Sequence, residues 1–137
     1  MRLFLDANAL FTAAHNPAGK AAFLFGPAHR TSWSLCSSAY AVEEARRNLA
    51  RKRPAALDHF DELVASMELV SQPAQCPAPI LALPAKDEPI WFAARAAKVS
   101  HLLTGDIKDF GAHMNRPAHT DGIVIQSVAE FLASLGA

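Results

Sequence analysis

The hydrophobic positions of the chain fall into two patterns, which are short continuous runs and longer stretches with a helical period. The runs at residues 2–5, 67–70, 101–104 and 122–125 are mostly apolar, as is typical of parallel strands covered on both faces. A further strand is predicted at 31–36, where serines weaken the pattern. Because helical segments separate these runs, the order of elements predicts an α/β fold with a central parallel sheet of about five strands.

Amphipathic stretches between the strands predict helices, and local signals mark their ends. The expected helices lie at residues 7–14, 18–25 and 39–52, after Pro54, at 90–99 and at 128–135. Ser37 or Ser38 can cap the helix at 39–52, and Ser127 with Glu130 forms a capping box. The proline-rich segment 71–84 is expected to be a loop inside a single domain that spans residues 1–137.

The composition is that of an ordinary globular chain. Of the 137 residues, 51% are apolar and 19% are charged, and no apolar run approaches the roughly 20 residues that span a bilayer. Asp6 interrupts the first apolar run too early for a signal peptide, and the isolated Cys36 and Cys76 indicate reduced thiols in a cytoplasmic protein. The formal net charge is zero, so any surface that binds nucleic acid must be local.

Acidic residues recur where predicted strands end or predicted helices begin. Asp6 follows the first strand, Asp106 follows the fourth, Asp87 precedes the helix after the proline-rich segment, and Glu43 and Glu44 lie early in the longest helix. In a parallel sheet, the carboxyl ends of strands and the amino ends of helices meet at one edge, where open α/β sheets bind ligands. We therefore expect four acids to converge there: Asp6, Asp87, Asp106 and one of the two glutamates.

Each of these acids alone has an ordinary structural interpretation. An Asp at a helix start is commonly an N-cap, an Asp after Gly is commonly a turn residue, and Glu early in a helix favours the macrodipole. Four acids that converge are much less probable as a coincidence than any one of them alone. Such a cluster offers all-oxygen ligation, which Mg²⁺ and Mn²⁺ prefer. A site of this kind can activate water and stabilise a phosphoryl transition state.

Four segments carry a more specific signal, namely LFLDANALF, SSAYAVEEARRNL, KDEPIWFAA and TGDIKDF, in that order. Together they resemble the PIN-domain ribonucleases, including the VapC-type toxins of bacterial toxin–antitoxin pairs, and the resemblance extends to GIVIQSVAEFL near the end of the chain. It implies a single PIN-like domain with a three-layer α/β/α fold. It also implies metal-dependent cleavage of RNA phosphodiester bonds, without saying which RNA.

Position by position, Asp6, Glu44, Asp87 and Asp106 match the family's four acids, and Asp109 falls where many members have a further acid. The resemblance implies that these residues bind one or two Mg²⁺ or Mn²⁺ ions, with Glu44 binding a metal or orienting the attacking water. It also places Asn8 and Thr104 in supporting positions.

The resemblance also decides between the two neighbouring glutamates. Adjacent helical residues point about 100° apart, so at most one of them is expected to reach the metals. The family pattern has Ser, then Glu six residues on, followed at once by an apolar residue and by Leu five residues after the Glu. Ser38, Glu44, Ala45 and Leu49 fit this spacing, so Glu44 is assigned to the site and Glu43 to solvent.

RNA must be held by basic residues, because the predicted site is acidic. Arg46, Arg47 and Arg51, followed by Lys52 and Arg53, form the densest basic cluster, on the helix that carries Glu44. They are candidates for binding the RNA substrate. The alternative is a solvated helix end whose cations favour the C-terminus.

The remaining aromatic residues and histidines carry no comparable signal. Trp33 and Trp91 are expected in the core rather than as platforms for stacking bases. The histidines show no ligand pattern, which disfavours zinc, and His113 and His119 are expected at the surface.

Two other classes of function stay open. A haloacid-dehalogenase-like phosphatase also places an Asp after its first strand, but it needs a second Asp two residues later, where this chain has Asn8. A PIN-like module that binds RNA or a protein without cleaving is the other alternative. The resemblance also implies a homodimer and, if the chain is a toxin, an antitoxin partner whose Arg or Lys could neutralise the carboxylates.

Overall fold

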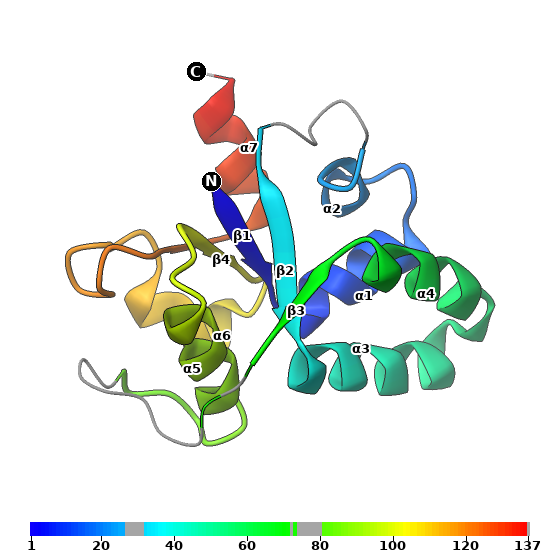
Figure 1. Cartoon of the computed structure of the whole chain (residues 1–137), viewed down its shortest axis with the longest axis horizontal. Coiled ribbons are helices and arrows are strands. Elements are labelled where there is room, and N and C mark those ends of the chain that lie inside the picture. Colours follow the sequence, from blue (N-terminus) through cyan, green and yellow to red (C-terminus); the bar gives the residue numbers. More distant parts are fainter. Residues whose placement is uncertain (27–31, 72, 74–80, 137) are drawn as a thin grey trace.

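The computed structural model describes residues 1–26, 32–71, 73 and 81–136, and its centre is a five-stranded, all-parallel sheet (Figure 1). The strands are β1 (Arg2–Leu5), β2 (Ser34–Ser38), β3 (Glu68–Val70), β4 (His101–Leu103) and β5 (Val124–Gln126). Their order across the sheet is β3-β2-β1-β4-β5, so β1 lies at the centre. The α/β class with a parallel five-stranded sheet is therefore confirmed.

Helices cover both faces of this sheet and complete a three-layer domain. The described α-helices are α1 (Ala7–His15), α2 (Lys20–Phe23), α3 (Ala39–Lys52), α4 (Leu57–Ala65), α5 (Glu88–Ala96), α6 (Ile107–Phe110) and α7 (Val128–Leu135), with 3-10 turns η2 (Pro54–Ala56) and η3 (Gly111–His113). Helices α1, α3 and α4 pack together on one side of the sheet, and α5 and α6 lie on the other (Figure 1).

The central strand explains why the sheet is buried on both faces. Leu3, Phe4 and Leu5 of β1 have no exposed surface, and each such side chain contributes on the order of 1.5–3 kcal/mol when removed from water. Trp33 and Trp91 belong to the same core, as predicted. Because β1 is central, the residue that follows it emerges in the middle of the carboxyl edge of the sheet.

Strand β2 lies further along the chain than predicted. It begins at Ser34 and ends at Ser38, whereas the expected strand began at Thr31, which lies outside the described residues. Ser34, which weakened the pattern within 31–36, is exposed, whereas Ser37 and Ser38 at the end of the strand are fully buried and their hydroxyl groups are bonded. Ser37 Oγ donates to the Leu5 carbonyl at 2.8 Å, and Ser38 Oγ accepts from the Ala41 amide at 3.2 Å as the N-cap of α3.

Several boundaries differ from the prediction. Helix α5 begins two residues earlier than expected and ends before Val99, because Lys98 adopts a positive φ of 53°. Helix α2 is shorter than the predicted 18–25, and β5 begins two residues later than the predicted 122–125. Helix α6 was not predicted, since four residues are too few to show a helical period.

One histidine was misplaced by the sequence argument. His113 is buried rather than at the surface, and its Nε2 lies 2.9 Å from the Ala82 carbonyl, which it can only approach as a donor. His119 is exposed, as expected, and its ring stacks on that of His113. Cys36 is buried, whereas Cys76 and most of the 71–84 segment lie outside the described residues.

None of the helices in the described part of the chain is both long and apolar enough to cross a membrane.

Candidate active site

Asp6 leaves the centre of the sheet and caps α1. One carboxylate oxygen, Oδ1, accepts from the Ala7 amide at 2.7 Å, and the other, Oδ2, accepts from the Thr104 hydroxyl at 2.7 Å. The residue is only 4% exposed. Burial raises the pKa of Asp6 to about 6, against the two hydrogen bonds that favour the charged form, and the nearby charges of Glu44 and Asp106 raise it further.

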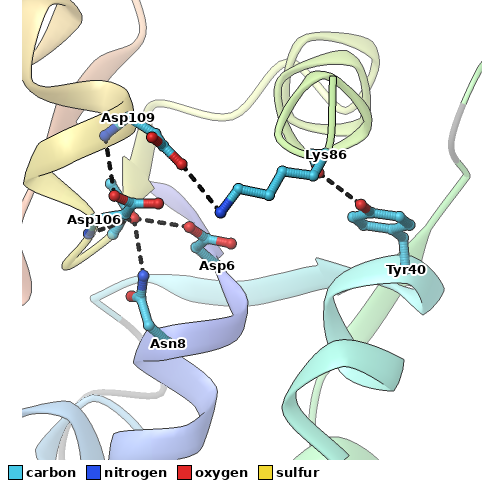
Figure 2. A network of polar contacts seen from close by, with 7 residues as sticks. Asp6, Asn8, Tyr40, Lys86, Asp106 and Asp109 are labelled. Atoms are coloured by element: carbon cyan, nitrogen blue, oxygen red, sulfur yellow. Dashed lines mark hydrogen bonds and ion pairs between the residues drawn. The ribbon is translucent and has the colours of Figure 1, made fainter. Parts of the chain in front are cut away.

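A short network after β4 holds Asp6 and Asp106 in place (Figure 2). Thr104 Oγ1 donates to Asp6 and accepts from the Asp106 amide at 3.1 Å and from Asn8 Nδ2 at 3.3 Å. Asn8 Oδ1 accepts from the Gly105 amide at 2.7 Å. The start of α1 is therefore tied to the end of β4 by side chains, and the charge of Asp106 acts on Asp6, although Asp6 does not belong to the group of acids whose oxygens converge.

Asp87 departs from the ordinary interpretation of an Asp at a helix start. It precedes α5 at the N-cap position, but its side chain makes no capping hydrogen bond. The residue is 7% exposed, and its Oδ2 is buried with no hydrogen-bond partner in the structure as described. Burial, and then a hydrogen bond with Asp109, raise the pKa of Asp87 to about 7. A buried carboxylate is costly unless its charge is neutralised, and either a proton shared with Asp109 or a bound cation would do so.

Three acids converge beside this oxygen. Asp87, Asp106 and Asp109 each bring one carboxylate oxygen within 4.8 Å of the others. Asp106 also caps the short helix α6 by accepting from the Asp109 amide at 3.0 Å. Hydrogen bonds with Asp87 and Lys86 lower the pKa of Asp109, so Asp109 carries the charge while Asp87 holds a shared proton more readily.

Glu44 lies on the Asp6 side of the site, apart from these three acids. It is half-buried on α3, and its charge raises the pKa of Asp6. Glu43 is exposed and faces Arg47, with 3.9 Å between Oε1 and Nη1. Glu44 is therefore the less exposed of the two glutamates and acts electrostatically on Asp6, while its assignment to the metal site stays a prediction.

The predicted basic residues divide between two surfaces. Arg47 and Arg51 line a shallow hollow together with Glu44. Arg46 instead turns to α4, where Nη1 lies 2.6 Å from Asp61 Oδ1 and the guanidinium lies over the Phe60 ring. Only two of the three arginines assigned to RNA binding therefore share a surface with a site acid.

Sequence reasoning missed two residues of the site, Lys86 and Tyr40. Lys86 Nζ lies 3.1 Å from Asp109 Oδ2, and the Tyr40 hydroxyl donates to the Lys86 carbonyl at 2.6 Å (Figure 2). Their positions offered a signal, because Lys86 directly precedes Asp87 and Tyr40 lies one helical turn before Glu44. Neither residue type is diagnostic on its own.

The donor set fits a hard divalent cation. The converging ligand atoms are all carboxylate oxygens, as Mg²⁺ and Mn²⁺ prefer. The unpartnered Asp87 Oδ2 provides a buried acceptor whose desolvation a cation would offset. The haloacid-dehalogenase alternative is not supported, since Asn8 stands at its required second Asp and both ends of the Asn8 amide are bonded within the protein.

Comparison with known proteins identifies the class. A family model for the PIN domain matches residues 2–108, and the chain therefore belongs to the PIN-domain family. The fold is similar to a chain in the crystal structure of VapBC2 from Rickettsia felis bound to a DNA fragment from their promoter. That likeness has a TM-score of 0.66 and 15% identity, and it covers 93% of this chain and 98% of the other. No match was found among proteins of curated function.

Proposed function

We propose that this PIN-domain protein is a Mg²⁺- or Mn²⁺-dependent endoribonuclease and the toxin of a toxin–antitoxin pair. The observation that carries the proposal is the buried, unpartnered Asp87 Oδ2 beside Asp106 and Asp109, at the carboxyl edge of a PIN-domain sheet. Nuclease activity is the common property of the PIN-domain ribonucleases that the sequence resembles.

In this proposal Asp6, Asp87, Asp106 and Asp109 hold the metal, and Glu44 either binds it or orients the attacking water. A bound divalent cation supplies Lewis-acid activation of water and neutralises charge that develops on the phosphate. Thr104 and Asn8 fix the direction of the Asp6 carboxylate through their hydrogen bonds. Asp87, with a pKa of about 7, is available to exchange its proton for a cation near neutral pH.

RNA would approach over the surface of α3. Arg47 and Arg51 line the hollow that also contains Glu44, so a phosphate bound there would lie beside the acidic site. Because Arg46 is engaged by Asp61, we assign it a lesser share of RNA binding.

An antitoxin is the proposed protein partner. The chain is further proposed to form a homodimer and to act in the cytoplasm. The similar fold in a VapBC2 crystal structure supports a search for such a partner. An antitoxin Arg or Lys entering the acidic site would neutralise the carboxylates in place of a metal.

Cleavage of RNA by the purified protein tests the proposal. We expect a fluorescently labelled RNA to be cut with Mg²⁺ or Mn²⁺ and left intact with EDTA. The variant Asp106→Asn should lose cleavage and keep its fold by circular dichroism. An intact RNA pool in the presence of metal would instead favour the PIN-like module that binds without cleaving.

A further inference from the structure

The ammonium group of Lys86 lies at the acidic site without belonging to any predicted set of site residues. Its Nζ lies 3.1 Å from Asp109 Oδ2, and Figure 2 shows the side chain extended from the turn before α5 toward α6. The hydrogen bond with Asp109 raises the pKa of Lys86, and the negative charges of Asp87 and Asp106 raise it further, so the ammonium lies within the field of all three acids. Lys86 therefore brings a positive charge directly beside these acids in the metal-free protein.

The backbone and the side chain of Lys86 are held very differently. The Lys86 carbonyl accepts from the Tyr40 hydroxyl at 2.6 Å, which ties this turn to α3. The Lys86 side chain is 65% exposed, whereas that of its partner Asp109 is 10% exposed. The ammonium can therefore leave the site by rotation of the Lys86 side chain alone. The backbone of Lys86 stays in place, so the neighbouring residue Asp87 is not displaced.

We propose that Lys86 is a built-in counter-cation that competes with the divalent metal for the acidic site. The inference rests on the proposed function in that it takes the carboxylates as the metal site. The negative charge of Asp109 attracts both the ammonium and a metal, so metal binding at Asp109 weakens the Lys86–Asp109 ion pair and brings a second cation close to the ammonium. The free energy of the Lys86–Asp109 ion pair that is lost on metal binding is subtracted from the binding free energy of the metal, so the apparent metal affinity is lower than without Lys86.

The chain offers a matched control for this competition. Lys108 lies on α6 between Asp106 and Asp109, is exposed, and makes no ion pair in the described part of the chain. Replacing either lysine by Met removes one positive charge close to the same acids. Only Lys86→Met removes a contact, so a difference between the two variants reports the contact rather than net charge.

Calorimetric titration with MnCl₂ of the purified full chain at pH 7.5 measures the effect. We expect Lys86→Met to bind Mn²⁺ about three- to fivefold more tightly than wild type, which corresponds to the upper end of what a partly exposed ion pair contributes. Lys108→Met should stay within about twofold, and Lys86→Arg should not tighten binding. In an Asp109→Asn background, Lys86→Met should change the affinity by less than about twofold.

Two results would overturn the inference about Lys86 and leave the proposed metal site standing. One is an Mn²⁺ affinity of Lys86→Met that equals that of wild type, and the other is an equal gain in affinity in Lys86→Met and Lys108→Met. If neither wild type nor Lys86→Met binds Mn²⁺, the inference fails together with the metal site of the proposed function. Binding that appears only in Lys86→Met would support the competition in its strongest form. Melting temperatures in EDTA confirm that each variant is folded.

Discussion

The Thr104 hydroxyl donates to Asp6 Oδ2 at 2.7 Å and so joins the ends of β1 and β4, the two strands whose following residues form the acidic site. Thr104 Oγ1 also accepts from the Asn8 side-chain amide and from the Asp106 backbone amide, so the hydrogen-bonding capacity of this hydroxyl group is fully used. Thr104 therefore fixes the orientation of a buried carboxylate rather than merely filling space.

Replacing Thr104 by Val should remove this support. We expect Thr104→Val to lower the free energy of unfolding by about 2 kcal/mol at pH 7.5, because a buried hydrogen bond to a charged group is lost. The pKa of Asp6 should rise further, since that bond lowers it. Urea denaturation measures the first effect. Thr104→Ser, which keeps the hydroxyl, should cost less than about 1 kcal/mol, and equal losses in the two variants would contradict the assigned role.

The metal-free protein should lose stability as the pH rises from about 4 to about 7. The pKa of Asp6 is raised from 3.8 to about 6, so the folded state binds more protons than the unfolded state in this window. Below pH 4 Asp6 is protonated in both states and its contribution to the free energy of unfolding is fully present. That contribution is lost as the pH rises through 6, where Asp6 ionises in the folded protein. The shift corresponds to about 3 kcal/mol for Asp6.

Urea denaturation in EDTA at pH 5.0 and pH 7.5 checks this dependence. Burial lowers the pKa of His101, which gives the opposite slope near pH 6, so the Asp6 contribution is read from a comparison with Asp6→Asn. The free energy of unfolding of Asp6→Asn minus that of wild type should therefore be larger at pH 7.5 than at pH 5.0, because wild type loses stability over this range when Asp6 ionises. No difference in pH dependence between the two proteins would show that Asp6 titrates normally.

Glu44 and Glu43 should differ sharply in their effect on cleavage. Glu44 is half-buried and acts on Asp6, whereas Glu43 is exposed and pairs loosely with Arg47. We expect Glu44→Gln to reduce metal-dependent RNA cleavage by about 100-fold or more, as for loss of a positioned acid or base, with little loss of stability. Glu43→Gln should be nearly neutral. The reverse order of activities would mean that the wrong glutamate had been assigned.

The arginines of α3 should separate RNA binding from stability. Arg47→Gln with Arg51→Gln should weaken RNA binding measured by fluorescence anisotropy, and should reduce the dependence of affinity on salt. Arg46→Gln should have a smaller effect on RNA and should cost up to about 1 kcal/mol of stability, because it removes an exposed ion pair with Asp61. A larger RNA effect for Arg46→Gln than for the double variant would move the binding surface toward α4.

Much of the fold could be predicted because its signals are local. The continuous apolar run of β1 and the capping box at Ser127 both report neighbours in sequence, and both were found as expected. The convergence of Asp87 and Asp106 could be predicted from the geometry of parallel sheets alone. Serine positions in β2 misled the boundary, because Ser37 is satisfied by a carbonyl 32 residues away.

The rest of the site depends on contacts between distant segments that no local pattern encodes. The ion pair of Lys86 with Asp109 depends on how the turn before α5 meets α6. The burial of His113 depends on a carbonyl at Ala82, 31 residues earlier. The orientation of Arg46 toward Asp61 is likewise set by the packing of α3 on α4, which the sequence does not show.

Metal binding at Asp87 tests most directly whether the converging acids form a metal site. Because its buried carboxylate is desolvated and close to Asp109, Asp87→Asn should leave the metal-free protein as stable as wild type or more so at pH 7.5. The same substitution should abolish the rise in melting temperature that Mn²⁺ gives wild type. The measurement is thermal unfolding over a Mn²⁺ titration. We predict a saturable upward shift in wild type and none in Asp87→Asn, whereas no shift in wild type, or equal shifts in both, would contradict the metal site.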